Sequence, residues 1–240
     1  MNVEKIDRKI SVIFATDVVD YSLHMEKDET GTVTSLRAYE KILKEAFKKH
    51  GGRLFNTGGD SFMAEFSSAV KAVECAIDFQ NIVKEKNIKP ALSFRIGINA
   101  GDVILEKKNL LGDGVNVAAR LEQLAQPDGI TISKSIFDYI EGKLDLQIQD
   151  LGIQQVKKNK FHAFDILLDP AQKRALKKNN YNLKIASIVA LSLLLFGVAY
   201  YQIINNSETP ETVITKTDRP SILVLPFKNL SASNNEFIAS

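Results

Sequence analysis

The sequence has 240 residues, of which 45% are hydrophobic and 25% are charged, and its net charge at pH 7 is +2. This composition is typical of a globular protein with one full hydrophobic core and additional segments. The net charge says nothing about nucleic acid, but the sequence has no arginine-rich or aromatic-interleaved patch, so we set nucleic acid aside as a partner. The one cysteine, Cys75, excludes a disulfide framework within one chain, and we expect it to be a reduced core thiol.

The first predicted element is a buried strand over residues 10–15, which is rich in β-branched and aromatic side chains. Asp17 follows at the carboxyl end of this strand, where open α/β sheets usually place ligand groups. The alternative is that Asp17 caps the next helix. A helix is expected over residues 33–47, because apolar side chains recur there at helical spacing, and Gly51 and Gly52 end it.

A hairpin comes next, with short apolar strands on either side of the tip Gly58-Gly59-Asp60. A carboxylate on a glycine tip reaches a ligand that bulkier neighbours would block. Hard divalent cations take oxygen ligands and are commonly held by one or two carboxylates plus substrate phosphates. Asp17 and Asp60 therefore suit Mg²⁺, and from these two residues alone a plain turn residue is an equal alternative for Asp60.

Helical and strand patterns continue to alternate as far as residue 168. Pro90 closes one helix, Pro127 stops another, and Gly101 with Asp102 predicts the turn of a second hairpin. We expect Asp102 to be only a turn residue. The remaining predicted elements are helices over residues 70–83, 116–125 and 133–140, and strands over residues 92–100, 103–105, 130–132, 146–151 and 161–167.

This order of elements predicts an α+β fold with ferredoxin-like βαββαβ logic. The helices are expected to pack on one face of a mainly antiparallel sheet. The other face of the sheet then needs cover, and we expect a dimer partner to supply some of it.

A third candidate site lies on the helix that a glycine turn opens after residue 112. Asn116 and Arg120 are four residues apart, so both project from one face of that helix. An amide and a fixed cation on one face suit a nucleotide, with Asn116 holding a ribose and Arg120 meeting phosphate charge as it develops in a transition state. The alternative is a surface ion pair between Arg120 and Glu122 or another acid.

Four motifs in this order resemble the catalytic domain of the class III adenylyl and guanylyl cyclases. The resemblance covers roughly residues 8–168. The motifs are Phe14-Ala15-Thr16-Asp17, Gly59-Asp60, Phe94-Arg95-Ile96-Gly97-Ile98-Asn99-Ala100-Gly101-Asp102 and Val115-Asn116-Val117-Ala118-Ala119-Arg120.

The resemblance implies conversion of ATP to 3′,5′-cyclic AMP and pyrophosphate, by attack of the ribose 3′-hydroxyl on the α-phosphate. It implies two metal ions, Mg²⁺ or Mn²⁺, held by Asp17, Val18 and Asp60. It also implies that Asn116 and Arg120 stabilise the transition state. Active sites in this family lie between two domains packed head to tail, so a homodimer with shared sites is expected and a monomer is expected to be inactive.

Several positions bear on the substrate. At the position of Asn56 adenylyl cyclases commonly have a Lys, and at the position of Asn109 they commonly have an Asp or Thr, and these residues read adenine. Neither Asn fits the Glu and Cys expected of guanylyl cyclases. An Asn amide offers both a donor and an acceptor, so ATP is favoured only because nothing in the sequence reads guanine. Asp20 replaces a usual Gly near the triphosphate. In this family a lysine of the last hairpin meets the phosphates, which makes Lys157 and Lys158 candidates, with a solvated lysine run as the alternative.

Other functions remain open beside the adenylate cyclase. A guanylate cyclase differs only in the base. A diguanylate cyclase is considered because Gly58-Gly59-Asp60-Ser61-Phe62 is close to the signature of that related fold, although Ser61 replaces an acid there. A catalytically silent dimerisation module is the third alternative, motivated by Asp20, Asn56 and Asn109.

A segment without charge, residues 185–204, follows a basic stretch, and its 20 residues span about 30 Å as a helix. We expect a single transmembrane helix in an inner or plasma membrane, with a buried core helix as the alternative. The positive-inside rule and the lack of an apolar signal segment over residues 1–8 predict a cytoplasmic catalytic domain. The expected segments are the cyclase domain over 1–168, a basic juxtamembrane segment over 169–184, the helix, a linker over 205–219, and the start of an extracytoplasmic TolB-like domain over 220–240.

Overall fold

The computed structural model describes residues 7–156, 159–175 and 181–205. The chain divides into two units, Met1–Lys177 and Lys178–Ser240. The first unit contains strands β1 (Asp7–Val18), β2 (Arg53–Gly58), β3 (Ser61–Phe66), β4 (Phe94–Glu106), β5 (Asn109–Leu111), β6 (Ile130–Ser133), β7 (Ile148–Val156) and β8 (Asn159–Ile166), helices α1 (Tyr21–Lys27), α2 (Glu29–His50), α3 (Ala69–Glu85), α4 (Asp113–Leu124) and α5 (Lys134–Ile140), and a short 3₁₀ turn (Pro170–Gln172).

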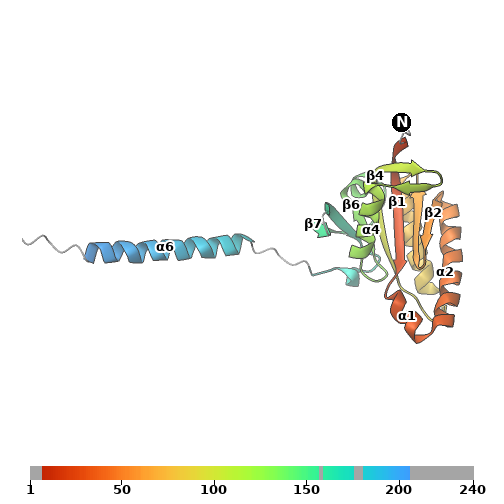
Figure 1. The fold of residues 1–240 in the computed structure, drawn as a ribbon, viewed down its shortest axis with the longest axis horizontal. Helices are drawn as coiled ribbons and strands as arrows, with labels where there is room; N and C mark the ends of the chain where they lie inside the picture. The colour runs from red at the N-terminus through yellow and green to blue at the C-terminus, as the bar shows by residue number, and fades with distance from the viewer. Residues whose placement is uncertain (1–6, 157–158, 176–180, 206–240) are drawn as a thin grey trace, which may run out of the picture. The chain divides into compact units, whose positions relative to one another are not determined.

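The sheet of this unit has the strand order β2-β3-β1-β4-β6-β8-β7, with β5 paired to β4 (Figure 1). Strand β1 is antiparallel to both of its neighbours, and the β4–β6 pair is parallel. Helices and mainly antiparallel strands therefore form one mixed α+β unit, which confirms the predicted fold class.

Both faces of the sheet carry helices. On one face, Phe14 of β1 packs edge-on against Phe47 of α2, with 5.1 Å between the ring centroids, and α3 and α5 share this core. On the other face, Ile13 and Ala15 of β1 pack with Ala118 of α4, so Figure 1 shows α2 and α4 on opposite sides of β1. The expectation of helices on one face only was wrong, because β1 is apolar on both faces and offers a core to each.

Strand β4 runs from Phe94 to Glu106 without a turn at Gly101. The predicted hairpin at Gly101 and Asp102 was wrong, and the chain reverses later, at Lys107, which has a φ of 57°. Gly101 lies close to α4, since a Cβ there would lie 3.2 Å from the Cα of Gly114 at the start of that helix. Asp102 is a strand residue, and it accepts a hydrogen bond of 2.6 Å from Arg8.

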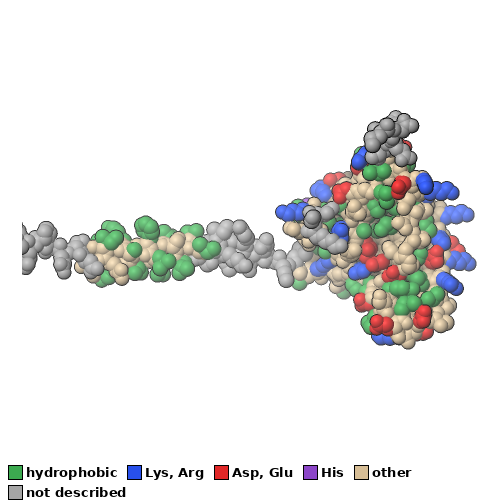
Figure 2. Space-filling view, viewed as in Figure 1, with side chains coloured by type: hydrophobic (Ala, Val, Ile, Leu, Met, Phe, Trp, Pro, Cys, Tyr) green, Lys and Arg blue, Asp and Glu red, His purple; other side chains and the backbone are tan. Residues whose placement is uncertain are grey.

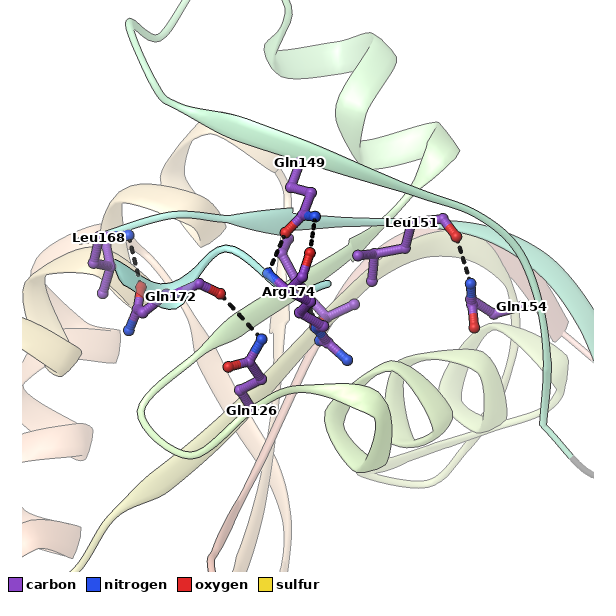
Figure 3. A network of polar contacts seen from close by, with 9 residues as sticks. Gln126, Gln149, Leu151, Gln154, Leu168, Gln172 and Arg174 are labelled. Atoms are coloured by element: carbon purple, nitrogen blue, oxygen red, sulfur yellow. Dashed lines mark hydrogen bonds and ion pairs between the residues drawn. The ribbon is translucent and has the colours of Figure 1, made fainter. Parts of the chain in front are cut away.

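The segment that follows β8 is bound to the sheet edge (Figure 3). Gln149 of β7 exchanges two hydrogen bonds of 2.8 Å with the backbone of Arg174. The Arg174 guanidinium donates to both carboxylate oxygens of buried Asp165, at 2.5 and 2.8 Å. Gln126, which lies just after α4, donates to the carbonyl oxygen of Gln172 at 3.1 Å. Residues 169–174 are therefore held within the first unit. The predicted domain boundary at residue 168 stays a prediction.

Cys75 of α3 is fully buried in the main core. Burial raises the pKa of its thiol to about 12, so the thiol stays protonated at neutral pH. The prediction of a free thiol in the core is therefore confirmed.

The second unit is described only over helix α6 (Tyr181–Asn205). Where this helix is coloured in Figure 2, its side chains are mainly hydrophobic. Among the described residues it is the one helix long and apolar enough to cross a membrane, over Ile188–Asn205. The predicted linker beyond Asn205 and the predicted TolB-like segment over 220–240 lie outside the described residues.

Candidate active site

Asp17 and Asp60 lie together at one end of the sheet. Antiparallel pairing of β1 with β3 sets Thr16 opposite Phe62, which puts the next residue of β1 beside the hairpin tip. The tip turns through Gly59, which has a φ of 65°, a conformation that glycine adopts without strain. Asp17 belongs to the strand, and the residue that precedes α1 as its N-cap is Asp20, so Asp17 is not a helix cap.

The negative charge of Asp17 disfavours the charged form of Asp60. Burial raises the pKa of the Asp60 carboxyl, and the negative charge of Asp17 raises it further, while the backbone N–H groups of Asp60 and Val18 oppose the shift. A divalent cation between the two acids would remove this repulsion, so the donor set fits Mg²⁺ or Mn²⁺. No group of three or more His, Cys, Asp or Glu suited to a metal occurs among the described residues. A metal ion at this pair would therefore be held by two carboxylates together with substrate phosphates.

Arg95 is a site residue that the sequence analysis did not single out. It lies on β4 directly opposite Asp17. Its Nε and Nη2 donate to the two oxygens of the Asp17 carboxylate at 3.1 and 2.7 Å. One signal was present in the sequence, since Arg95 is the sole charged residue between Ala91 and Gly101. A guanidinium therefore neutralises Asp17 in this structure.

Glu122 of α4 completes a cluster of ionisable side chains around Arg95. The residue is 5% exposed, and its Oε1 lies 3.4 Å from the Nε of Arg95. Burial raises the pKa of Glu122 to about 9, and a hydrogen bond with Asp17 and the charge of Asp17 act in the same direction, while Arg95 opposes them. The neutral form of Glu122 is therefore favoured relative to that of an exposed glutamate. It does not pair with Arg120, because residues two apart on a helix point to nearly opposite sides.

Asn116 and Arg120 share the other side of α4, as expected from their spacing. Asn116 is exposed and Arg120 is half-buried. Within the part of the chain that the structure describes, the Nε of Arg120 is buried without a hydrogen-bond partner. The structure brings Asp17 and Asp60 together, and it directs Asn116 and Arg120 away from the side of α4 that carries Glu122.

The remaining candidates lie on the strands beside the hairpin. Asn56 is an exposed residue of β2, next to an irregularity in the pairing with β3. Asn109 begins β5, and its Oδ1 accepts a hydrogen bond of 2.9 Å from the backbone N–H of Leu110. Arg53 links the two regions by donating to the carbonyl oxygen of Lys108 at 2.8 Å. Lys157 and Lys158 lie outside the described residues.

The family model for the adenylate and guanylate cyclase catalytic domain matches residues 2–168. The chain belongs to this family. A protein of Rhizobium meliloti (strain 1021) named "Putative adenylate cyclase 3" is 43% identical over 159 residues, which are 64% of this chain and 27% of that protein. An adenylate cyclase of Streptomyces coelicolor is 30% identical over 132 residues, which are 54% of this chain and 33% of that protein. The chain therefore spans about a quarter to a third of the length of these two curated relatives.

The cyclase fold is also found in solved structures. The crystal structure of an adenylate/guanylate cyclase/hydrolase from Silicibacter pomeroyi superimposes with a TM-score of 0.63 at 31% identity, covering 69% of this chain and all of that one. The catalytic core of a rhodopsin–guanylyl cyclase with converted specificity, solved in complex with ATPαS, has the same fold, with a TM-score of 0.62 at 23% identity over 68% of this chain and 98% of that one. The carboxylate pair and the arginines described above lie within the cyclase domain of this chain.

Proposed function

We propose that the chain is a membrane-anchored class III nucleotide cyclase that converts ATP to 3′,5′-cyclic AMP and pyrophosphate. The observation that carries this proposal is the pair Asp17 and Asp60, two acids that lie where β1 meets a glycine tip, with the charge of Asp17 disfavouring the charged form of Asp60. Relatives named adenylate cyclases support the same reaction. Cyclic AMP made from ATP serves signal transduction.

In this proposal Asp17 and Asp60, with Val18 beside them, hold two Mg²⁺ or Mn²⁺ ions. Bound there, the ions supply Lewis acidity at the ribose 3′-hydroxyl and at the α-phosphate. Arg95 screens the negative charge of Asp17 before the site is loaded, at donor–acceptor distances of 2.7 and 3.1 Å. The cluster excludes water around Glu122, which strengthens the electrostatic interactions within it.

Asn116 and Arg120 supply transition-state stabilisation to the site of a second copy. They project from the side of α4 opposite Glu122, and no hydrogen bond or ion pair joins Arg120 to Asp17 or Asp60 in the described residues. An arginine that serves a partner's site must be open to that partner, and Arg120 is only half-buried in its own domain. The active enzyme is therefore a homodimer with two shared sites.

The base is read by Asn56 and Asn109. Because Leu110 already donates to the Oδ1 of Asn109, the amide group of Asn109 is the part left to meet a base. An amide N–H₂ donates equally well to N1 of adenine and to O6 of guanine. ATP is preferred over GTP because of the adenylate cyclases among the relatives, and Lys157 and Lys158 are assigned to the phosphates.

The chain is anchored once in an inner or plasma membrane. Helix α6 supplies the span, and we retain 185–204 for its membrane-embedded part. Basic residues are concentrated in the juxtamembrane segment 169–184, which keeps the cyclase domain in the cytoplasm. A linker over 205–219 and the start of a TolB-like domain over 220–240 then lie on the far side.

The test is product analysis of the purified chain in detergent, with ATP or GTP and with Mg²⁺ or Mn²⁺, using mass spectrometry. We expect cyclic AMP from the wild type and almost none from Asp17→Ala. Asp102→Ala is the matched control, because Asp102 is an exposed acid that pairs with Arg8 on the strand surface. Cyclic GMP would reverse the base assignment, cyclic di-GMP would establish a diguanylate cyclase, and no product at high protein concentration would favour the silent module.

A further inference from the structure

Close packing of α4 on β4 fixes the position of Glu122. A Cβ at Gly97 would lie 2.1 Å from the backbone nitrogen of Glu122, so only glycine lets the helix come this near. Arg95 and Gly97 are two residues apart on β4 and therefore share one face of the sheet. The side chain of Glu122 thus enters the cluster from the helix side while Asp17 enters it from β1.

Arg95 lies between two acids, with hydrogen bonds to Asp17 and a longer ion pair with Glu122. Asp17 accepts from both Nε and Nη2, at 3.1 and 2.7 Å. The Oε1 of Glu122 is 3.4 Å from the same Nε and has no hydrogen-bond partner in the described part of the chain. A buried oxygen without a hydrogen-bond donor destabilises the folded state, because its lost hydration is not replaced. We therefore expect Oε1 to accept a hydrogen bond in another state of the site.

Metal binding at Asp17 creates that other state. A guanidinium and a divalent cation compete for the same carboxylate oxygens and repel each other, so Asp17 must give up at least one bond to Arg95 when it binds an ion. Arg95 then lies beside the bound cation and has lost at least one of its hydrogen bonds to the Asp17 carboxylate. The Oε1 of Glu122, which accepts no hydrogen bond in the described residues, lies 3.4 Å from the Nε of Arg95.

We propose that Glu122 is a positioning residue that accepts the Nε of Arg95 when Asp17 binds a metal ion, and so makes Asp17 available to the metal. The inference rests on the proposed cyclase function. Glu122 acts through Arg95 and Asp17 and does not touch the substrate. Without the acceptor at position 122, Arg95 stays on Asp17 and competes with the ion.

The chemistry of glutamine supplies a matched control. A glutamine has nearly the size and shape of a glutamate and keeps a carbonyl oxygen that can accept the Nε of Arg95. Glu122→Gln keeps the acceptor. Glu122→Leu has a similar size and removes it, and Glu122→Met serves the same purpose where the leucine variant fails to fold.

The experiment measures Mn²⁺ binding directly, by electron paramagnetic resonance of free Mn²⁺ titrated into the full chain in detergent. Metal affinities typically fall 10–100-fold when an outer residue that orients a ligand is lost, so we expect a loss of about that size for Glu122→Leu. Glu122→Gln should bind Mn²⁺ within about threefold of the wild type. In an Arg95→Gln background, Glu122→Leu should have no effect, because the competing cation is gone.

Three results would overturn the inference. These are unchanged Mn²⁺ binding in Glu122→Leu, equal losses in the Leu and Gln variants, and an equal loss with and without Arg95. The proposed function fails separately, if the wild-type chain makes no cyclic nucleotide. Metal binding is read without turnover, so the two failures are distinguishable.

Discussion

Replacing Arg174 with alanine should destabilise the first unit strongly. The guanidinium donates to both oxygens of Asp165, which is 5% exposed, and Thr131 donates to the same carboxylate at 2.6 Å. Gln149 binds only the backbone of Arg174, so its two hydrogen bonds survive the substitution (Figure 3). The variant therefore removes the cation and leaves a buried carboxylate with one hydroxyl donor.

Breaking a buried ion pair by removing one partner costs about 3–5 kcal/mol. The side chain of Arg174 is 22% exposed, so water enters where the guanidinium was, and the lower end of this range applies, about 3 kcal/mol. For a domain of this size, 1 kcal/mol lowers Tm by about 2–4 °C, so Arg174→Ala should lower Tm by about 6–12 °C.

Differential scanning calorimetry of the purified full chain in detergent measures this shift. Arg8→Ala is the control, since the pair of Arg8 with Asp102 has a similar distance of 2.6 Å but side chains that are 57% and 52% exposed. Such an exposed pair contributes at most about 1 kcal/mol. If Arg174→Ala lowers Tm no more than Arg8→Ala does, the reasoning from burial is refuted.

Three other predictions concern the shared site, the acid stability and the packing of α4. Asp17→Ala and Arg120→Ala should each lose activity on the order of 10²–10³-fold, and a 1:1 mixture should recover about a quarter of the wild-type rate, because random pairing makes half of the dimers mixed and each mixed dimer has one intact site. No recovery despite confirmed mixed dimers would refute sharing. Burial alone would raise the pKa of Glu65, but hydrogen bonds from Lys9, Ser11 and Arg53 overcome it and lower the pKa to about 2, so the stability that Glu65 contributes, about 3 kcal/mol, is present above pH 4.5 and lost as pH falls toward 2. In urea unfolding at several pH values, the free energy of unfolding should fall less steeply toward acid pH in Glu65→Gln than in the wild type. The same pH dependence in both proteins would contradict the prediction. Gly97→Ala forces a Cβ to 2.1 Å from the backbone of Glu122, so it should cost about 1–3 kcal/mol in urea unfolding and lower kcat, and a variant as stable and active as the wild type would show that α4 shifts freely.

Local patterns in the sequence predicted the α+β class, the glycine tip that carries Asp60 and the shared face of Asn116 and Arg120. Each of these depends on residues a few positions apart. The strand end marked Asp17 as a candidate ligand, and the glycine tip marked Asp60. The structure adds that these two residues lie close together.

Contacts between distant segments could not be predicted in the same way. Arg95 meets Asp17 only through the register of β1 against β4, across 78 positions. Glu122 looks like a surface acid on its helix, and it is buried because Gly97 lets α4 touch the sheet. Gly101 was taken for a turn because a glycine needed for close approach and a glycine needed for a turn look alike in one sequence.

The buried Cys75 makes this chain a ready background for site-specific labelling. It is the one cysteine in 240 residues, and its fully buried, protonated thiol will not react with maleimide or methanethiosulfonate reagents while the protein is folded. A single cysteine introduced at an exposed position would therefore be the only labelled site, without prior removal of a native thiol. Spin labels placed in this way on two copies would report the distance between them by pulsed resonance, in the native sequence otherwise.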